Sequence, residues 1–145
     1  MLDELDALRQ AIQSGDYAQA LALIDELDEM SRDDKINKIA SYMRVLLIHL
    51  IKQAAEKRTT RSWTSSVKIA LSQIAKSNKR RKSGGYYLDD DSLVLALAET
   101  WPDALELAAL EAFEGMYTAL QLAALVQRDE LLASALAQIK HTQQA

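Results

Sequence analysis

Cysteine is absent from this chain of 145 residues, and proline and glycine are scarce, with one and four residues. Without cysteine, neither a disulfide framework nor a thiolate metal site can form. Alanine and leucine are abundant and no run alternates like a strand, so the summed propensities favour helices. The hydrophobic content of 49% suits a chain that buries a core without cross-links.

Long hydrophobic runs are missing as well. No stretch reaches the roughly 18 uncharged apolar residues of a membrane-spanning helix. The longest apolar run, Val45 to Ile51, is interrupted by His49. The first residues, Met1 to Asp6, are acidic where a secretory signal would be basic. We therefore expect a cytoplasmic protein without a membrane partner.

The apolar spacing predicts an all-α fold in which residues 1–145 form a single domain. We expect a bundle of about six to seven helices around a long central helix at about residues 32–56. Before it, Gly15 allows a turn and Asp16 caps a helix that ends near Met30. Ser31 is the expected cap of the central helix.

The second half of the chain shows more breaks. A helix begins at Trp63, and the charged, glycine-containing segment 76–85 predicts a mobile basic loop. Asp89 to Ser92 cap a helix that ends at Thr100, and Pro102 fits the first turn of the next helix, which ends near Gly115. A helical tail over 116–145, with a break near Arg128, completes the expected fold.

Charge is strongly segregated along the chain. Residues 1–34 carry ten acidic and two basic side chains, residues 35–82 carry one and thirteen, and residues 83–145 carry ten and two. A net charge of −4 therefore hides a basic middle third. Such segregation affects the choice of partners more than the fold.

The basic middle third contains a candidate patch for binding phosphates, which would give salt-dependent, sequence-independent affinity for nucleic acid. Few aromatic residues are interleaved with these charges, so surfaces for stacking bases are not evident. Pairing with carboxylates of the same chain or of a second copy is the favoured interpretation, and nucleic acid is the alternative partner. The patch comprises Lys57, Arg58, Lys79, Arg80, Arg81 and Lys82.

A second candidate surface surrounds His49, which lies away from the main apolar face of the central helix. A histidine beside a carboxylate and a tyrosine can act as a general base or as a pH-sensitive contact. The structural alternative, a hydrogen-bonded histidine packed by Trp63, is favoured because no second ligand or nucleophile is nearby. The candidate cleft comprises Tyr42, His49, Lys52, Glu56, Arg61 and Trp63.

Two acidic pairs, Glu26 with Glu29 and Glu111 with Glu114, place carboxylates on one helix face. Such pairs hold Mg²⁺ in all-helical nucleotide pyrophosphohydrolases, but those enzymes place the two pairs much closer in sequence. A solvated helix face is therefore the favoured interpretation. With no recognisable nucleophile elbow or phosphate-binding loop, we assign no catalytic residue, metal site or cofactor.

The segment from Leu8 to Ile74 resembles a bacterial family, abundant in cyanobacteria, called domain of unknown function 29. The residues that carry the likeness include Gly15-Asp16, the run from Leu46 to Lys52, and Arg61-Ser62-Trp63. The resemblance covers about the first half of the chain, and the C-terminal thirty residues depart from the usual tail of the family. It implies an all-helical fold and a prokaryotic origin, and it implies no activity.

The sequence therefore favours a non-enzymatic module or scaffold for protein–protein interaction, with an unknown protein partner and a possible homodimer. Association with nucleic acid through residues 57–82 and a Mg²⁺-dependent pyrophosphohydrolase are the alternatives.

Overall fold

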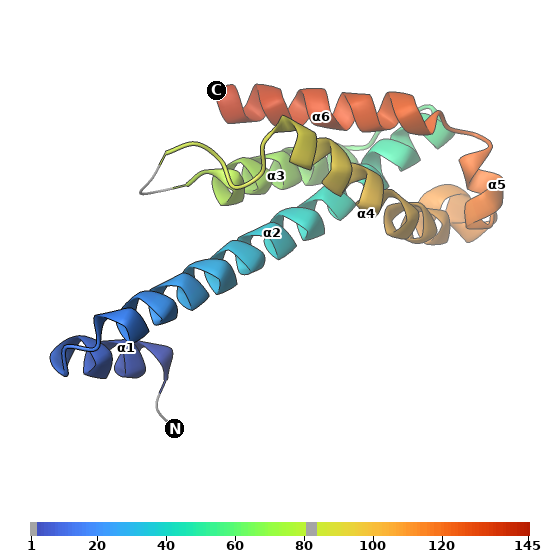
Figure 1. Ribbon diagram of the computed structural model, residues 1–145. Coiled ribbons are helices and arrows are strands. Elements are labelled where there is room, and N and C mark those ends of the chain that lie inside the picture. Colours follow the sequence, from blue (N-terminus) through green and yellow to red (C-terminus); the bar gives the residue numbers. More distant parts are fainter. Residues whose placement is uncertain (1–2, 81–83) are drawn as a thin grey trace. The chain divides into compact units, whose positions relative to one another are not determined.

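The computed structural model describes residues 3–80 and 84–145, so Arg81 and Lys82 of the predicted basic patch lie outside the described residues. Over those ranges the chain forms α-helices and short connections (Figure 1). The all-α fold class is confirmed. Contacts divide the chain into two compact units, residues 1–35 and 36–145. The single-domain organisation stays a prediction.

Unit 1 contains α1 (Glu4–Gln13) and the first part of α2 (Tyr17–Glu56). The predicted turn is confirmed, because Gly15 has a φ of +77° and the Asp16 carboxylate accepts a hydrogen bond from the Gln19 amide at 3.2 Å. Aspartate at this position satisfies an amide that has no partner within the helix. Among the described residues of unit 1, Ala11 and Ala20 are buried and three leucines are half-buried.

The predicted break at Ser31 is wrong, because α2 continues through it from Tyr17 to Glu56. The central helix expected at residues 32–56 is therefore the later part of a 40-residue helix. Serine is favoured at helix caps but is tolerated inside a helix, and no glycine or proline lies nearby to stop the helix. A local capping preference was outweighed by helix propagation, which adds one hydrogen bond for each residue that is fixed.

Unit 2 combines the later part of α2 with α3 (Arg61–Asn78), α4 (Asp90–Glu111), the short turn η1 (Ala112–Gly115), α5 (Ala119–Ala123) and α6 (Arg128–Gln144). Its core includes fully buried side chains from four helices, Leu47, Ile74, Leu97 and Ile139. Helix α6, drawn in red, runs alongside α3 and α4 (Figure 1). Among the described residues, no helix is long and apolar enough to cross a membrane.

Pro102 does not begin a new helix, as the sequence predicted, but lies inside α4. A proline in a helix interior removes one hydrogen bond and costs about 3 kcal/mol. The neighbouring Trp101 and Ala104 are buried in the core, whereas Pro102 faces solvent. Burial of one face of α4 therefore keeps the helix continuous through the proline. The start of α4 is as predicted, since Asp89 accepts a hydrogen bond from the Ser92 amide, which also lowers the pKa of Asp89.

Asn78 anchors the base of the predicted basic loop. Helix α3 extends to Asn78, so residues 76–78 are helical rather than part of the loop. The fully buried Asn78 side chain accepts the Leu88 amide at 2.7 Å and donates to the Leu88 carbonyl at 3.1 Å and to Gln143 of α6 at 2.8 Å. The Arg80 amide also donates to the Gly85 carbonyl.

Two helices form the predicted C-terminal tail. Thr118 caps α5 through a capping box with Gln121, and α6 begins at Arg128, where the sequence indicated a break. The box satisfies two amides at the start of a helix of five residues.

Candidate functional site

Three residues of the predicted cleft, Lys52, Glu56 and Trp63, lie together where α2 ends and α3 begins. The Lys52 ammonium lies 4.6 Å from the centroid of the Trp63 ring, and the Arg58 guanidinium lies 4.7 Å from it. Thr60 fixes this geometry, since its hydroxyl accepts the Trp63 amide at 3.1 Å and caps α3. The indole thus interacts with two cations at once.

Lys52 is unusual because its side chain is only 6% exposed. Its ammonium lies 3.6 Å from a carboxylate oxygen of Glu111, which is 54% exposed. Burying a lysine is costly unless the charge is paired, so the Glu111 carboxylate and the Trp63 ring together offset the lost hydration. This arrangement ties α2 to α3 and to the end of α4.

Glu56 connects the same junction to the turn after α4. One of its carboxylate oxygens accepts from Arg58 at 3.1 Å, and the other accepts from the Phe113 amide at 3.3 Å. Lys57, Phe113 and Glu114 have φ values of 55°, 51° and 58°, a left-handed region that costs energy for residues other than glycine. The strained residues therefore lie at the two segments that Glu56 joins.

A shallow cavity of about 290 Å³ opens at this junction. Two of the three glutamates that line the cavity are paired with cations, Glu56 with Arg58 and Glu111 with Lys52. No serine, threonine or cysteine lies among its lining residues, so the cavity offers no nucleophile with a base beside it. Its lining consists of Glu56, Arg58, Trp63, Glu111, Phe113, Glu114 and Met116.

His49 is half-buried, and its Nδ1 atom is buried without a hydrogen-bond partner among the described residues. Burial lowers the pKa of His49, the charge of Lys52 lowers it further, and the charge of Glu111 opposes both. The imidazole is thus favoured in its neutral form. The hydrogen bond expected for a structural histidine is absent at Nδ1.

The remaining members of the predicted cleft lie elsewhere. Tyr42 is half-buried and packs against the core of unit 2. Arg61 is exposed at the first position of α3. Conversely, the prediction omitted Glu111 and Phe113, which contact Lys52 and Glu56 across more than fifty residues of sequence.

The predicted basic patch is divided between the two ends of α3. Lys57 and Arg58 precede this helix, and Lys79 and Arg80 follow it, so about 27 Å of helix separates the two pairs. Arg58 already pairs with Glu56, and Arg80 lies 5.2 Å from the Tyr87 ring. The phosphate-binding patch stays a prediction, and its described members lie at opposite ends of one helix.

The two predicted acidic pairs lie in different units. Within residues 3–80 and 84–145, no group of three or more His, Asp or Glu side chains is placed to hold a metal ion. Glu26 and Glu29 are exposed, as are Glu111 and Glu114. The pyrophosphohydrolase alternative stays a prediction.

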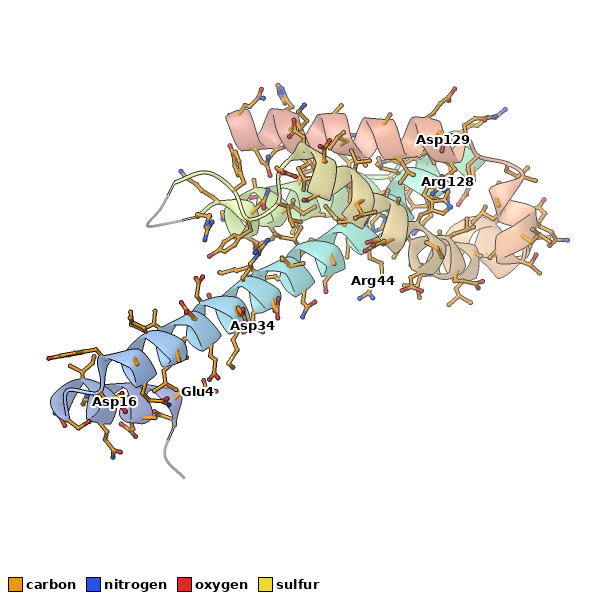
Figure 2. All side chains as sticks on the ribbon, in the orientation of Figure 1. Glu4, Asp16, Asp34, Arg44, Arg128 and Asp129 are labelled. Carbon is orange, nitrogen blue, oxygen red and sulfur yellow. The ribbon has the colours of Figure 1, made fainter. Side chains whose placement is uncertain are left out.

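Unit 1 presents a different surface, acidic and apolar together. Residues 3–35 include ten acidic and three basic side chains. Figure 2 shows side chains projecting all around its two helices, with Glu4, Asp16 and Asp34 labelled. Its exposed large apolar residues are Leu5, Ile12, Tyr17, Leu21, Ile24 and Met30.

The fold and these surfaces define an all-α protein with one well-packed unit and one acidic helical unit. The chain belongs to the family described as Domain of unknown function DUF29, whose sequence profile matches residues 5–134. The match extends well beyond Leu8 to Ile74, and only residues 135–145 of the tail expected to diverge lie past its end. No curated protein and no solved structure gives a significant match.

Proposed function

We propose that this protein is a non-enzymatic protein–protein interaction module and that unit 1 provides its contact surface. The supporting observation is the contrast between the surface and the interior of unit 1. Among its described residues, six large apolar side chains are exposed and three leucines are half-buried, whereas the buried residues are Ala11 and Ala20. Large exposed apolar patches, rimmed by polar residues, are typical of interaction sites.

The energetics of short helices support the same proposal. Helix α1 has ten residues, a length that is marginal for an isolated helix in water, and most helical stability in proteins comes from packing an amphipathic face. Within unit 1, Ala11 and Ala20 provide little such packing. A partner that covers Leu21 and Ile24 would supply the missing burial, at about 25 cal/mol for each Å² of apolar surface.

The alternatives have less support. The cavity at the Lys52–Trp63 junction offers paired carboxylates rather than free catalytic groups, which weighs against an enzyme. Few aromatic residues are interleaved with the basic side chains, which weighs against nucleic acid. A cytoplasmic location is part of the proposal, since a chain without cysteine suits a reducing compartment.

Retention of partners by matched variants tests the proposal. The full chain, a Leu21→Ser/Ile24→Ser variant and a Leu120→Ser control would be immobilised and exposed to a nuclease-treated lysate of the source organism. Leu120 is 84% exposed and lies in unit 2, so its substitution alters apolar surface outside unit 1. We expect a defined set of proteins, retained by the wild type and the control and lost by the unit 1 variant. Identical retention by all three would contradict the proposal.

A further inference from the structure

Helix α3 carries an exposed basic face. The helix contains three basic and no acidic residues. Arg61, Lys68 and Lys76 recur at spacings that place them on one side of the helix, together with Ile69, which is 59% exposed. We call this surface the basic face; it comprises Arg61, Ser65, Lys68, Ile69, Ser72 and Lys76.

The part of α2 in unit 1 carries a face of opposite charge. Tyr17, Leu21, Ile24 and Asp28 follow one another at steps of four, three and four residues and are all exposed, as is Asp25 beside them. We call this set of five residues the acidic face. Tyr17 and Leu21 are 67% and 63% exposed.

Neither face has its charges paired within its own unit. Among the described residues of unit 2, no ion pair includes Arg61, Lys68 or Lys76, and in unit 1 the ion pair found joins Arg9 to Asp6. Both faces also combine their charges with exposed apolar side chains. The two faces therefore have opposite charges, and each has exposed apolar area that the other could cover.

We infer that the acidic face of one copy of this chain docks on the basic face of α3 in a second copy. This inference rests on the proposed function and names one partner of unit 1. The two faces have similar lengths, about 17 Å from Tyr17 to Asp28 and about 23 Å from Arg61 to Lys76. In a symmetric dimer the contact occurs twice, because each copy contributes both faces. Pairing unit 1 with unit 1 would instead bring two acidic surfaces together.

A charge-exchange experiment tests this contact. One variant, Asp25→Lys/Asp28→Lys, makes both faces basic, and the other, Lys68→Glu/Lys76→Glu, makes both acidic. All four residues are exposed, so both variants should fold, which far-ultraviolet circular dichroism checks. The control, Glu99→Lys/Glu106→Lys, changes the net charge by the same amount as Asp25→Lys/Asp28→Lys, at exposed positions of α4.

Sedimentation equilibrium of the full-length proteins measures the outcome. We expect the wild type and the α4 control to dimerise at low salt. Each face variant should have a dimer dissociation constant at least about tenfold higher. An equimolar mixture of the two face variants should restore dimerisation, because each acidic face then meets a basic one in the other chain. Raising the salt from about 20 to about 500 mM should weaken the wild-type dimer.

Three results would overturn the inference: a monomeric wild type at low salt, a dimer that neither face variant weakens, or a mixture that stays monomeric. Failure here leaves the proposed function untouched, since that proposal is decided by the unit 1-dependent retention of other proteins.

Discussion

Units 1 and 2 solve the same problem, keeping helices folded, in different ways. Unit 2 buries 21 core residues drawn from α2 to α6, and many of them are fully inaccessible. Among its described residues, unit 1 buries Ala11 and Ala20, half-buries three leucines and exposes its other large apolar residues. Folding free energy follows apolar area removed from water, so unit 2 holds nearly all of the stability that the isolated chain can have.

A helix with a regular apolar stripe is therefore not always packed within its own chain. Leu21 and Leu47 lie on the same helix, α2, yet one is 63% exposed and the other is fully buried. The first is available to a partner, and the second is committed to the core. The following predictions test that contrast.

The largest expected effect comes from truncating those two leucines. Leu47→Ala removes a fully buried side chain and should lower the free energy of unfolding by about 2–5 kcal/mol. Leu21→Ala, the matched control, should change it by no more than about 0.5 kcal/mol. Denaturant titrations followed by circular dichroism measure both. Equal destabilisation by the two substitutions would show that Leu21 is packed like Leu47, which would contradict the difference between the units.

Asn78 tests the polar interior of unit 2, a feature that unit 1 lacks among its described residues. Asn78→Ala leaves the amide and carbonyl of Leu88 without their partner and should cost about 1–3 kcal/mol. Asn78→Asp keeps the acceptor but loses both donated hydrogen bonds. Thermal unfolding should rank the wild type above both variants. If Asn78→Ala unfolds like the wild type, this hydrogen-bond cluster does not stabilise the loop.

Helix caps allow a direct comparison between the two units, with smaller expected changes in the free energy of unfolding. Thr60 caps α3 in unit 2, and Thr60→Ala should lower the free energy of unfolding by about 1 kcal/mol. Asp16→Ala removes the corresponding cap in unit 1 and should instead speed hydrogen exchange near Gln19 without moving the global midpoint. A shift of that midpoint would show that unit 1 unfolds together with unit 2.

His49 should give the smallest effect, a pH dependence confined to unit 2. Its pKa in the folded protein lies below its usual 6.5, so the unfolded chain binds more protons just below that pH. Stability is therefore fully present above about pH 6.5 and falls as the pH drops towards the folded pKa. His49→Gln should flatten this part of the profile. An unchanged profile in His49→Gln would contradict the prediction.

Much of the fold followed from residue spacing, because long helices with regular apolar faces are the strongest local signal. Two predicted helix boundaries were wrong because other interactions outweighed a local sequence signal. Ser31 and Pro102 are signals for helix starts, but the chain continued as helix at both positions. Propagation of α2 and burial of Trp101 and Ala104 in α4 outweighed these local preferences.

Only some of the residues at the junction of α2 and α3 could be predicted from the sequence. Lys52, Glu56 and Trp63 lie within twelve residues of one another around a single helix end, so local reasoning could group them. Glu111 and Phe113 reach the same place from the end of α4, and no pattern in the sequence links positions so far apart. Arg58 could have been added, since it lies two residues before the Thr60 cap.

The position of Trp63 makes it a built-in spectroscopic reporter. The chain has two tryptophans, and the other, Trp101, is buried in the core of unit 2. Replacing Trp101 with phenylalanine would leave a single indole, and its emission would respond to the two cations beside it. One fluorescence signal would then follow the α2–α3 junction, while circular dichroism follows the helices of the whole chain.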